Sequence, residues 1–280
     1  MSEQILKDLY VQVGDIKTRY RESGTGGSPI ILIHGLGGLI EHWEHNLQAL
    51  SEHHRVYALD MIGFGFTGKP SAPYSISYLA KFVQDFMALK GIQNACVIGH
   101  SLGSGVAFEL CLLDPSRVKK LVLTSGFGFG RKGALELRIL SIPFIGEKLM
   151  QPSRDGTADF LKLMFYDPAF VTDEMVDILL EWSSKPSSVE VYLETLRSVT
   201  NFFGLKRKVI QNTLNQSKHI KIPALILWGQ DDKIIPVEQA YIARNTLPNA
   251  NLHVFEKCGH MPQVECAYEF NRIVLEFLAQ

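Results

Sequence analysis

The sequence has few cysteines, and their spacing fits neither a metal site nor a disulfide framework. The four are Cys96, Cys111, Cys258 and Cys266, and no C-x-x-C pair occurs among them. Structural zinc sites and disulfide-rich folds both depend on closely paired cysteines. We therefore expect a protein whose chemistry needs no metal and no cofactor.

The chain also lacks a long apolar run and a strong charge of either sign. It contains no stretch of about 20 apolar residues that would span a bilayer, and Met1-Ser2-Glu3-Gln4 does not resemble a signal peptide. Its 28 basic and 29 acidic residues give a formal net charge of −1, so no overall field attracts nucleic acid or an anionic membrane. We expect a cytoplasmic protein, monomer or homodimer, that acts on a small molecule without nucleic acid or a membrane span.

The composition is that of a globular protein with a large core. Hydrophobic residues make up 46% of the 280 positions and charged residues 20%, which excludes an intrinsically disordered chain. This length suits one large α/β domain with an insertion, or two small domains.

Short apolar runs alternate with helical patterns along most of the chain. Two antiparallel strands are expected first, followed by apolar strands separated by amphipathic helices, at residues 10–13, 16–20, 30–33, 56–60, 120–124, 224–229 and 252–255, with one more short strand at the start of the stretch 95–103. Strands alternating with helices indicate a parallel sheet covered on both faces. The fold class predicted is α/β, with a mostly parallel eight-stranded sheet and helices on both faces.

The alternation stops between residues 127 and 215, where helical segments occur and no buried strand is expected. One of these helices is predicted to begin at Ser187, with Glu190 completing a capping box. We interpret residues 127–215 as an inserted helical cap, and residues 1–126 and 216–280 as the core domain that carries it.

One stretch, Gly99-His100-Ser101-Leu102-Gly103, has the pattern G-x-S-x-G. It lies between a predicted strand and a predicted helix, where glycines allow the chain to turn sharply. A serine at the tip of that turn projects its hydroxyl beside a helix N-terminus, which favours negative charge. We predict that Ser101 is a nucleophile.

A serine hydroxyl needs a base to accept its proton, and His260 is the best-placed histidine. It follows the last predicted strand, and the loops after parallel strands gather at the sheet edge where Ser101 lies. His34 also ends a strand, but the glycines after it suggest a backbone role. His100 is expected to point elsewhere on the turn, and His42 to lie on the surface.

A histidine base needs an acid that fixes its tautomer and stabilises its charged form. Asp232 and Asp231 follow the strand that ends at Gly229. We predict Asp232 as the acid, with Asp231 as the alternative.

The oxygen of an attacked carbonyl needs N–H donors as its negative charge grows. The N–H of Leu102, at the helix start, is one predicted donor of this oxyanion hole. The N–H of Leu36, in the glycine-rich loop after His34-Gly35, is the other.

In the order Ser101, Asp232, His260, these parts resemble the α/β-hydrolase superfamily over nearly all 280 residues. The resemblance rests on five short motifs: His34-Gly35-Leu36-Gly37-Gly38, Asp60 with Gly63-Phe64-Gly65 and Lys69-Pro70, Gly99-His100-Ser101-Leu102-Gly103, Gly229 with Asp232 and Pro236, and Gly259-His260. It implies a capped serine hydrolase, similar to small esterases and lipases or to the meta-cleavage-product hydrolases. The latter cut carbon–carbon bonds in dienoate products of aromatic ring opening.

Two departures from the meta-cleavage pattern lead us to expect ester cleavage. That subgroup has asparagine before the nucleophile, where this chain has His100. It also has a cap arginine and a tryptophan near the histidine, whereas the helix at 173–183 has no arginine and Met261 follows His260. The function predicted is hydrolysis of carboxylic esters with small apolar acyl or aryl groups. Carbon–carbon hydrolysis, a lyase or haloperoxidase, and a ligand receptor on the same fold remain the alternatives.

Overall fold

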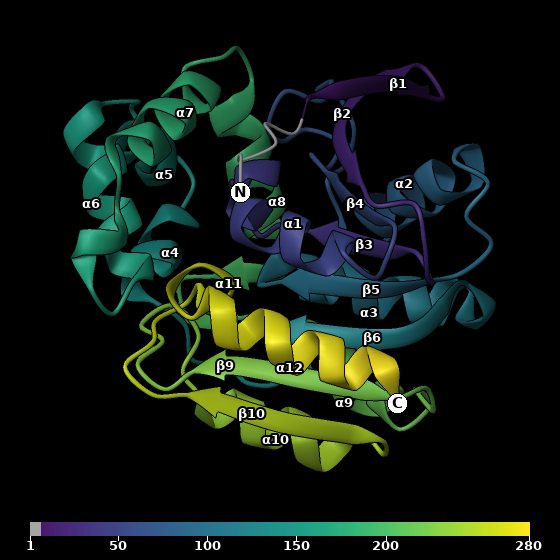
Figure 1. Ribbon diagram of the computed structural model, residues 1–280. Helices are drawn as coiled ribbons and strands as arrows, with labels where there is room; N and C mark the ends of the chain where they lie inside the picture. The colour runs from purple at the N-terminus through teal and green to yellow at the C-terminus, as the bar shows by residue number, and fades with distance from the viewer. Residues whose placement is uncertain (1–6) are drawn as a thin grey trace.

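A computed structural model describes residues 7–280; residues 1–4, which the signal-peptide prediction concerns, lie outside this range. A twisted sheet with helices on both sides forms the body of the molecule, and further helices lie over one edge of the sheet (Figure 1).

Within residues 7–280 the main sheet has eight strands: β1 (Leu9–Val13), β2 (Ile16–Ser23), β3 (Ile30–Ile33), β4 (Val56–Leu59), β5 (Ala95–His100), β6 (Val118–Thr124), β9 (Ala224–Gly229) and β10 (Ala250–Phe255). Their spatial order is β1-β2-β4-β3-β5-β6-β9-β10. The pairs β1–β2 and β2–β4 are antiparallel and the other five pairs are parallel. The predicted mostly parallel, eight-stranded α/β sheet is therefore confirmed.

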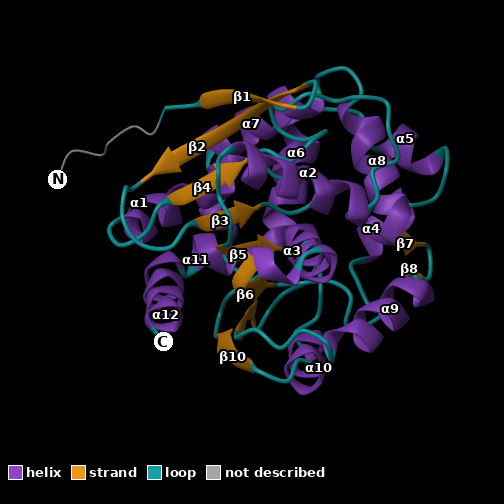
Figure 2. Ribbon diagram, turned by 90° about the vertical axis from the view of Figure 1, so that its right-hand side faces the viewer, coloured by secondary structure: helices purple, strands orange, loops and turns teal. Residues whose placement is uncertain are grey.

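Helices cover both faces of this sheet, as Figure 2 shows edge-on. They are α1 (Glu44–Ser51), α2 (Ile76–Leu89), α3 (Leu102–Leu113), α10 (Glu238–Thr246), α11 (Pro262–Glu265) and α12 (Ala267–Ala279). Short 3-10 helices occur at Ile40–Trp43 and Pro115–Arg117, and a third, Pro168–Phe170, lies in the segment between β6 and β9. In the described part of the chain, none of the helices combines the length and apolar character needed to cross a membrane.

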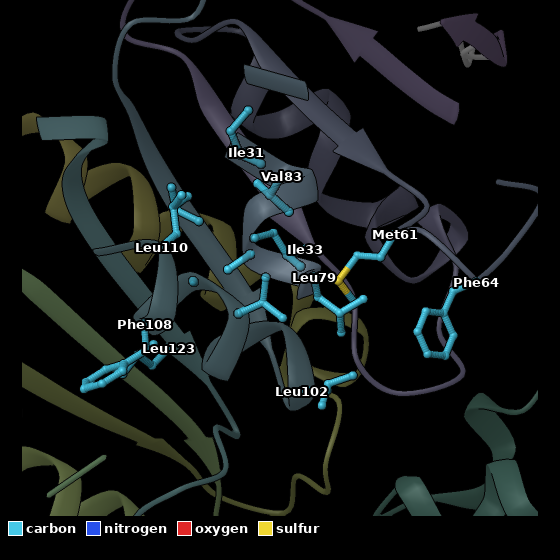
Figure 3. Close-up of a cluster of buried hydrophobic side chains, with 14 of the residues drawn as sticks. Ile31, Ile33, Met61, Phe64, Leu79, Val83, Leu102, Phe108, Leu110 and Leu123 are labelled. Atoms are coloured by element: carbon cyan, nitrogen blue, oxygen red, sulfur yellow. The ribbon is translucent and has the colours of Figure 1, made fainter. Parts of the chain in front are cut away.

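Strand β3 shows why the central strands are apolar throughout. Successive side chains of a strand point to opposite faces, and here both faces are buried. Ile31 and Ile33 pack with residues of α2 and α3 such as Val83 (Figure 3). Ile30 and Leu32 pack in the second core, which includes α1 and α12. A continuous apolar run is what a strand buried on both faces requires.

The segment between β6 and β9 (residues 125–223, the β6–β9 segment) is mainly helical. Its elements are α4 (Leu135–Leu140), α5 (Ile145–Leu149), α6 (Arg154–Met164), α7 (Asp173–Ser183), α8 (Ser188–Val199), β7 (Thr200–Asn201), β8 (Gly204–Leu205) and α9 (Arg207–Ser217). The boundaries of the predicted cap, 126/127 and 215/216, stay a prediction, and the second falls inside α9.

Two expectations about this segment were wrong. Strands β7 and β8 form a two-stranded ribbon, and both residues of β8 are buried. The capping box at Ser187 does not form, because Ser187 has a left-handed φ of 63° and its side chain accepts no capping hydrogen bond. An N-cap serine normally needs an extended backbone to reach the helix N–H groups.

A buried ion pair, Arg19–Asp60, connects β2 to the loops that follow β3 and β4. Asp60 Oδ2 lies 3.2 Å from Arg19 Nη1 and accepts a hydrogen bond from Phe66 N at 2.8 Å. Asp60 Oδ1 accepts one from Ile40 N at 2.9 Å. Burial raises the pKa of Asp60 to about 6, against the attraction of Arg19. The carboxylate thus fixes two loops at the sheet edge where β3 ends.

We expect Asp60→Ala to lower the free energy of unfolding by about 3–5 kcal/mol, because it leaves a buried guanidinium without one of its partners and two buried N–H groups without acceptors. Urea denaturation followed by circular dichroism measures this. The exposed Asp15→Ala is the matched control, with an expected change within about 0.5 kcal/mol. Equal stability of the two variants would contradict the structural role of Asp60.

Candidate active site

Ser101 occupies a strained turn between β5 and α3. Its φ is 53° and its ψ −116°, a conformation that costs a non-glycine residue free energy and is common at functional sites. The Ser101 side chain makes no capping hydrogen bond to α3. The hydroxyl is therefore not used to cap the helix that it precedes.

Close backbone contacts force this turn. A Cβ atom at Gly99 would lie 2.2 Å from Gly103 O, and one at Gly103 would lie 2.3 Å from Ile33 O. Neither position has room for a side chain, so both glycines of the G-x-S-x-G pattern are required by packing. The carboxyl end of β3 and the start of α3 consequently lie against each other beside Ser101.

Asp232 and His260 form a buried, hydrogen-bonded pair. His260 Nδ1 lies 2.8 Å from Asp232 Oδ2, and the two side chains are 3% and 0% exposed. The other carboxylate oxygen, Oδ1, accepts hydrogen bonds from Ile234 N and Ile235 N, each at 2.8 Å. Asp231, the alternative acid, is exposed. With the carboxylate on Nδ1, the ring presents Nε2 to other groups.

Ser101 and His260 line one cavity at the carboxyl edge of the sheet. The loops after β5 and β10 supply them, as expected from parallel strands ending at one edge. The cavity wall also contains side chains from the β6–β9 segment: Leu137, Phe160, Met164 and Tyr192. The structure thus brings together Ser101, Asp232 and His260, which are far apart in the sequence.

The two predicted oxyanion donors also lie beside Ser101. Leu36 and Leu102 line a cleft together with Ser101, and neither N–H donates to a backbone carbonyl in the described residues. Gly35 allows the Leu36 loop to come close, because a Cβ there would lie 3.1 Å from Ser101 Cβ. The arrangement agrees with the geometry expected of an oxyanion hole. That Leu36 and Leu102 act as its donors stays a prediction.

His34 holds the Leu36 loop through both ring nitrogens. Its Nε2 accepts a hydrogen bond from Met61 N at 3.0 Å, so Nδ1 carries the proton and donates to Gly35 O at 2.7 Å. Burial lowers the pKa of His34 to about 3, which keeps the ring neutral. The expected backbone role of His34 fits these contacts.

Two other histidines were placed wrongly by sequence reasoning. His100 does not point away from the site but lines the cavity with Ser101, and its Nε2 donates to His260 O at 2.8 Å. His42 is only partly exposed: its Nδ1 is buried, and the residue lines the same cavity. Burial lowers the pKa of His42 to about 4 and also lowers that of His100, so both rings are neutral.

Two cationic side chains of the cleft were also missed. Lys132 and Arg138 line the cleft that contains Ser101. The helix at 173–183, where the family resemblance places a cap arginine, has none. The available signal was their position, because both closely follow β6, whose end lies at the same sheet edge as Ser101.

Glu265 was missed as well, and it connects the His260 loop to the β6–β9 segment. Its Oε2 accepts a hydrogen bond from Gly259 N at 2.6 Å, and its Oε1 accepts from Tyr166 N at 2.8 Å and Asp167 N at 3.2 Å. His260 N adds a direct bond to Met164 O at 2.6 Å. The backbone beside His260 is therefore held by the segment that covers it.

The described residues contain no group of three histidine, cysteine, aspartate or glutamate side chains arranged to hold a metal ion.

We expect Glu265→Gln to speed hydrogen exchange at the Gly259 amide by about 10- to 100-fold, because an amide nitrogen cannot replace a carboxylate oxygen as acceptor and a charge-assisted hydrogen bond is lost. Hydrogen–deuterium exchange with peptide mapping over residues 255–266 measures this. Glu276→Gln, on the exposed side of α12, is the control and should leave the exchange unchanged. Similar exchange in both variants would show that Glu265 does not hold this loop.

Comparison with known proteins agrees with this geometry. Residues 28–266 match the family model described as alpha/beta hydrolase fold. A 2-hydroxy-6-oxononadienedioate/2-hydroxy-6-oxononatrienedioate hydrolase of Burkholderia vietnamiensis is 32% identical, over 94% of this chain and 91% of that protein. The dihydrolipoyllysine-residue acetyltransferase component of the acetoin cleaving system of Cupriavidus necator is 31% identical, over 96% of this chain and 68% of that protein.

Among solved structures, a meta-cleavage product hydrolase from Pseudomonas fluorescens IP01 superposes with a TM-score of 0.82 at 29% identity, covering 98% of this chain and 97% of the other. The family match spans most of the chain, and the sheet order and serine turn agree with it. The chain belongs to the α/β-hydrolase fold family.

Proposed function

We propose that this protein is a serine hydrolase of the meta-cleavage-product type, which cleaves a carbon–carbon bond next to a ketone in a 2-hydroxy-6-oxo-dienoate. The observation that carries the hydrolase assignment is the buried Asp232–His260 pair at 2.8 Å, with His260 and the strained Ser101 lining one cavity. The choice of a carbon–carbon bond rests on the relatives. They favour carbon–carbon hydrolysis, the alternative given above, over the predicted ester hydrolysis.

The proposed reaction begins when Ser101 Oγ attacks the ketone carbon and its proton passes to His260. The charged imidazole is stabilised by Asp232, which remains ionised. The N–H groups of Leu36 and Leu102 stabilise the new oxyanion, each by about 3 kcal/mol or more.

Before the carbon–carbon bond breaks, the proton of the 2-hydroxyl group shifts to C5, so that C5 is tetrahedral and lies next to a conjugated 2-oxo-3-ene group. The bond between C5 and the attacked carbon C6 then breaks, the carbonyl of the acyl-serine forms, and the electron pair spreads from C5 to the 2-oxo oxygen as a dienolate. His260 returns its proton to this dienolate and the acyl group stays on Ser101. Water, deprotonated by His260, attacks the acyl carbon and releases a carboxylic acid and the free serine. The sequence of steps consumes one water and needs no oxidant or reductant.

Two observations support a carboxylate-bearing substrate. Curated relatives between 27% and 32% identical over almost the whole chain are hydrolases of 2-hydroxy-6-oxo acids. Lys132 and Arg138 line the Ser101 cleft, and a carboxylate taken out of water needs such a cation. Of the two, Arg138 is the less exposed.

Ester hydrolysis remains a second candidate, because it passes through the same acyl-enzyme. The observation that favours it is the wall around Ser101 and His260, which consists of apolar side chains and the neutral rings of His42 and His100. A neutral apolar acyl group fits this wall without any cation. The ratio of turnover on a dienoate to turnover on an ester decides between the two.

We expect Ser101→Ala to reduce turnover of both substrate classes by at least about 10⁴-fold, because the nucleophile is lost and only binding and oxyanion stabilisation remain. Spectrophotometric assays with a 2-hydroxy-6-oxo-dienoate and with p-nitrophenyl butyrate measure it, and circular dichroism checks the fold. Full activity in the variant would rule out a serine mechanism at this site. Wild-type turnover of the ester far above that of the dienoate would favour the second candidate.

We expect Arg138→Ala to raise KM for the dienoate about tenfold or more, since a charge-assisted contact to the carboxylate is lost, and to leave KM for a neutral ester almost unchanged. Arg131 provides a matched control. Arg138 Nε donates to Phe202 O and Arg131 Nε donates to Phe203 O, but Arg131 does not line the cleft. If Arg131→Ala and Arg138→Ala have the same effect on KM, Arg138 does not bind the carboxylate.

A further inference from the structure

A second cavity of about 350 Å³ lies beyond the Ser101 cleft, between α3 and the helices α8 and α9. Its lining combines apolar residues, among them Phe108, Leu123, Phe129 and Val209, with polar ones such as Glu109, Lys208 and Asn212; Figure 3 shows Phe108 and Leu123 close together there. A cavity of about 150 Å³ already holds a benzene ring, so this one has room for an extended alkyl or aryl group that contacts its apolar residues.

Among residues 7–280, only Phe127 and Val199 line both this cavity and the cleft that contains Ser101. Phe127 comes from the turn after β6 and Val199 from the end of α8. The two side chains therefore form the partition between the cleft and the cavity behind it.

The local structure fixes the position of the Phe127 ring. A Cβ atom at Gly105 would lie 2.2 Å from Phe127 Cε1, so the ring occupies the space that glycine leaves free on α3. Gly105 is one helical turn beyond Ser101, which brings the ring close to the nucleophile. Any larger residue at position 105 would displace the ring.

The turn that carries Phe127 has a residue with positive φ on each side, and the backbone is strained at Ser125 but not at Gly128. Ser125 has a φ of 45° and Gly128 a φ of 114°. Positive φ at a non-glycine residue costs free energy and persists only where neighbouring contacts impose it. Here Ser125 N donates to Leu227 O at 2.9 Å, which ties the turn to β9.

We propose that Phe127 is a specificity-determining residue: it closes the substrate cleft against the second cavity and so limits the length of the apolar group that the enzyme accepts. This inference rests on the proposed function, because the apolar group in question is part of the molecule attacked by Ser101. It applies equally to the acyl group of an ester and to the ketone side of a dienoate.

Alkylphosphonate p-nitrophenyl esters with chains from butyl to dodecyl test the inference, because they label a reactive serine without turnover. In the wild type we expect the labelling rate to fall once the chain exceeds the cleft. In Phe127→Ala we expect longer chains to react faster, by up to about fourfold for each methylene that enters the second cavity. Phe127→Leu should give a smaller shift in the same direction.

A double variant shows where the longer chain goes. Val209→Trp fills the second cavity from α9, and added to Phe127→Ala it should remove the gain on long chains. Phe144→Ala, at a position 87% exposed in the β6–β9 segment, is the control for loss of an aromatic ring and should keep the wild-type profile.

The outcomes separate this inference from the proposed function. An unchanged chain-length profile in a folded, labelled Phe127→Ala protein overturns the inference alone. A gain that survives Val209→Trp also overturns it, since the chain would then lie elsewhere. If the wild type is not labelled even by the butyl compound, Ser101 is not a reactive nucleophile, and the proposed function fails together with the inference.

Discussion

The contact between the start of α3 and the carboxyl end of β3 is the constraint on which the site depends. Gly103 lies so close to Ile33 O that a side chain there would overlap it, and Gly99 meets the backbone of Gly103 in the same way. These contacts leave Ser101 only a strained backbone conformation, which holds it at the sheet edge. Strands β9 and β10 end at the same edge, so the loops that follow them place Asp232 and His260 there as well.

The position of His260 is fixed from two sides, by the core and by the β6–β9 segment. Its ring is set by Asp232 from the core, but its backbone is held by Met164 O and, through Glu265, by the peptide groups after α6. A displacement of the β6–β9 segment would therefore disturb the histidine loop as well as uncover the cavity. Core and covering segment are coupled at the residue proposed as the base, so substrate access and the position of that residue are not independent.

Most of the fold and the core of the site followed from the sequence, for a physical reason. Alternating apolar runs show the succession of strands along the chain, and the carboxyl ends of parallel strands share one edge, so Ser101, Asp232 and His260 could be selected from local pattern. The spatial order of the strands was not predicted. The positions of His42, His100 and Glu265 could not be predicted in this way, because they depend on contacts between segments far apart in the chain, whereas the position of Arg138 after β6 was a signal that was overlooked. His100, for example, bonds to the carbonyl of residue 260. The predicted capping box at Ser187 does not form for a related reason. The local sequence pattern favours it, but the fold holds Ser187 in a left-handed backbone conformation.

The parts of the site that define a serine hydrolase do not define its substrate. Relatives of similar identity are named as a hydrolase of 2-hydroxy-6-oxononadienedioate and as a dihydrolipoyllysine-residue acetyltransferase component, so similar chains carry different activities. Substrate specificity must therefore come from contacts between the substrate and groups other than Ser101, His260 and Asp232. In this chain such groups cluster in the short stretch after β6, which contributes Phe127, Lys132 and Arg138 to a single cleft. If the two proposals for Phe127 and Arg138 hold, that one stretch sets both the length and the charge that the cleft accepts, separately from the residues proposed to carry the chemistry.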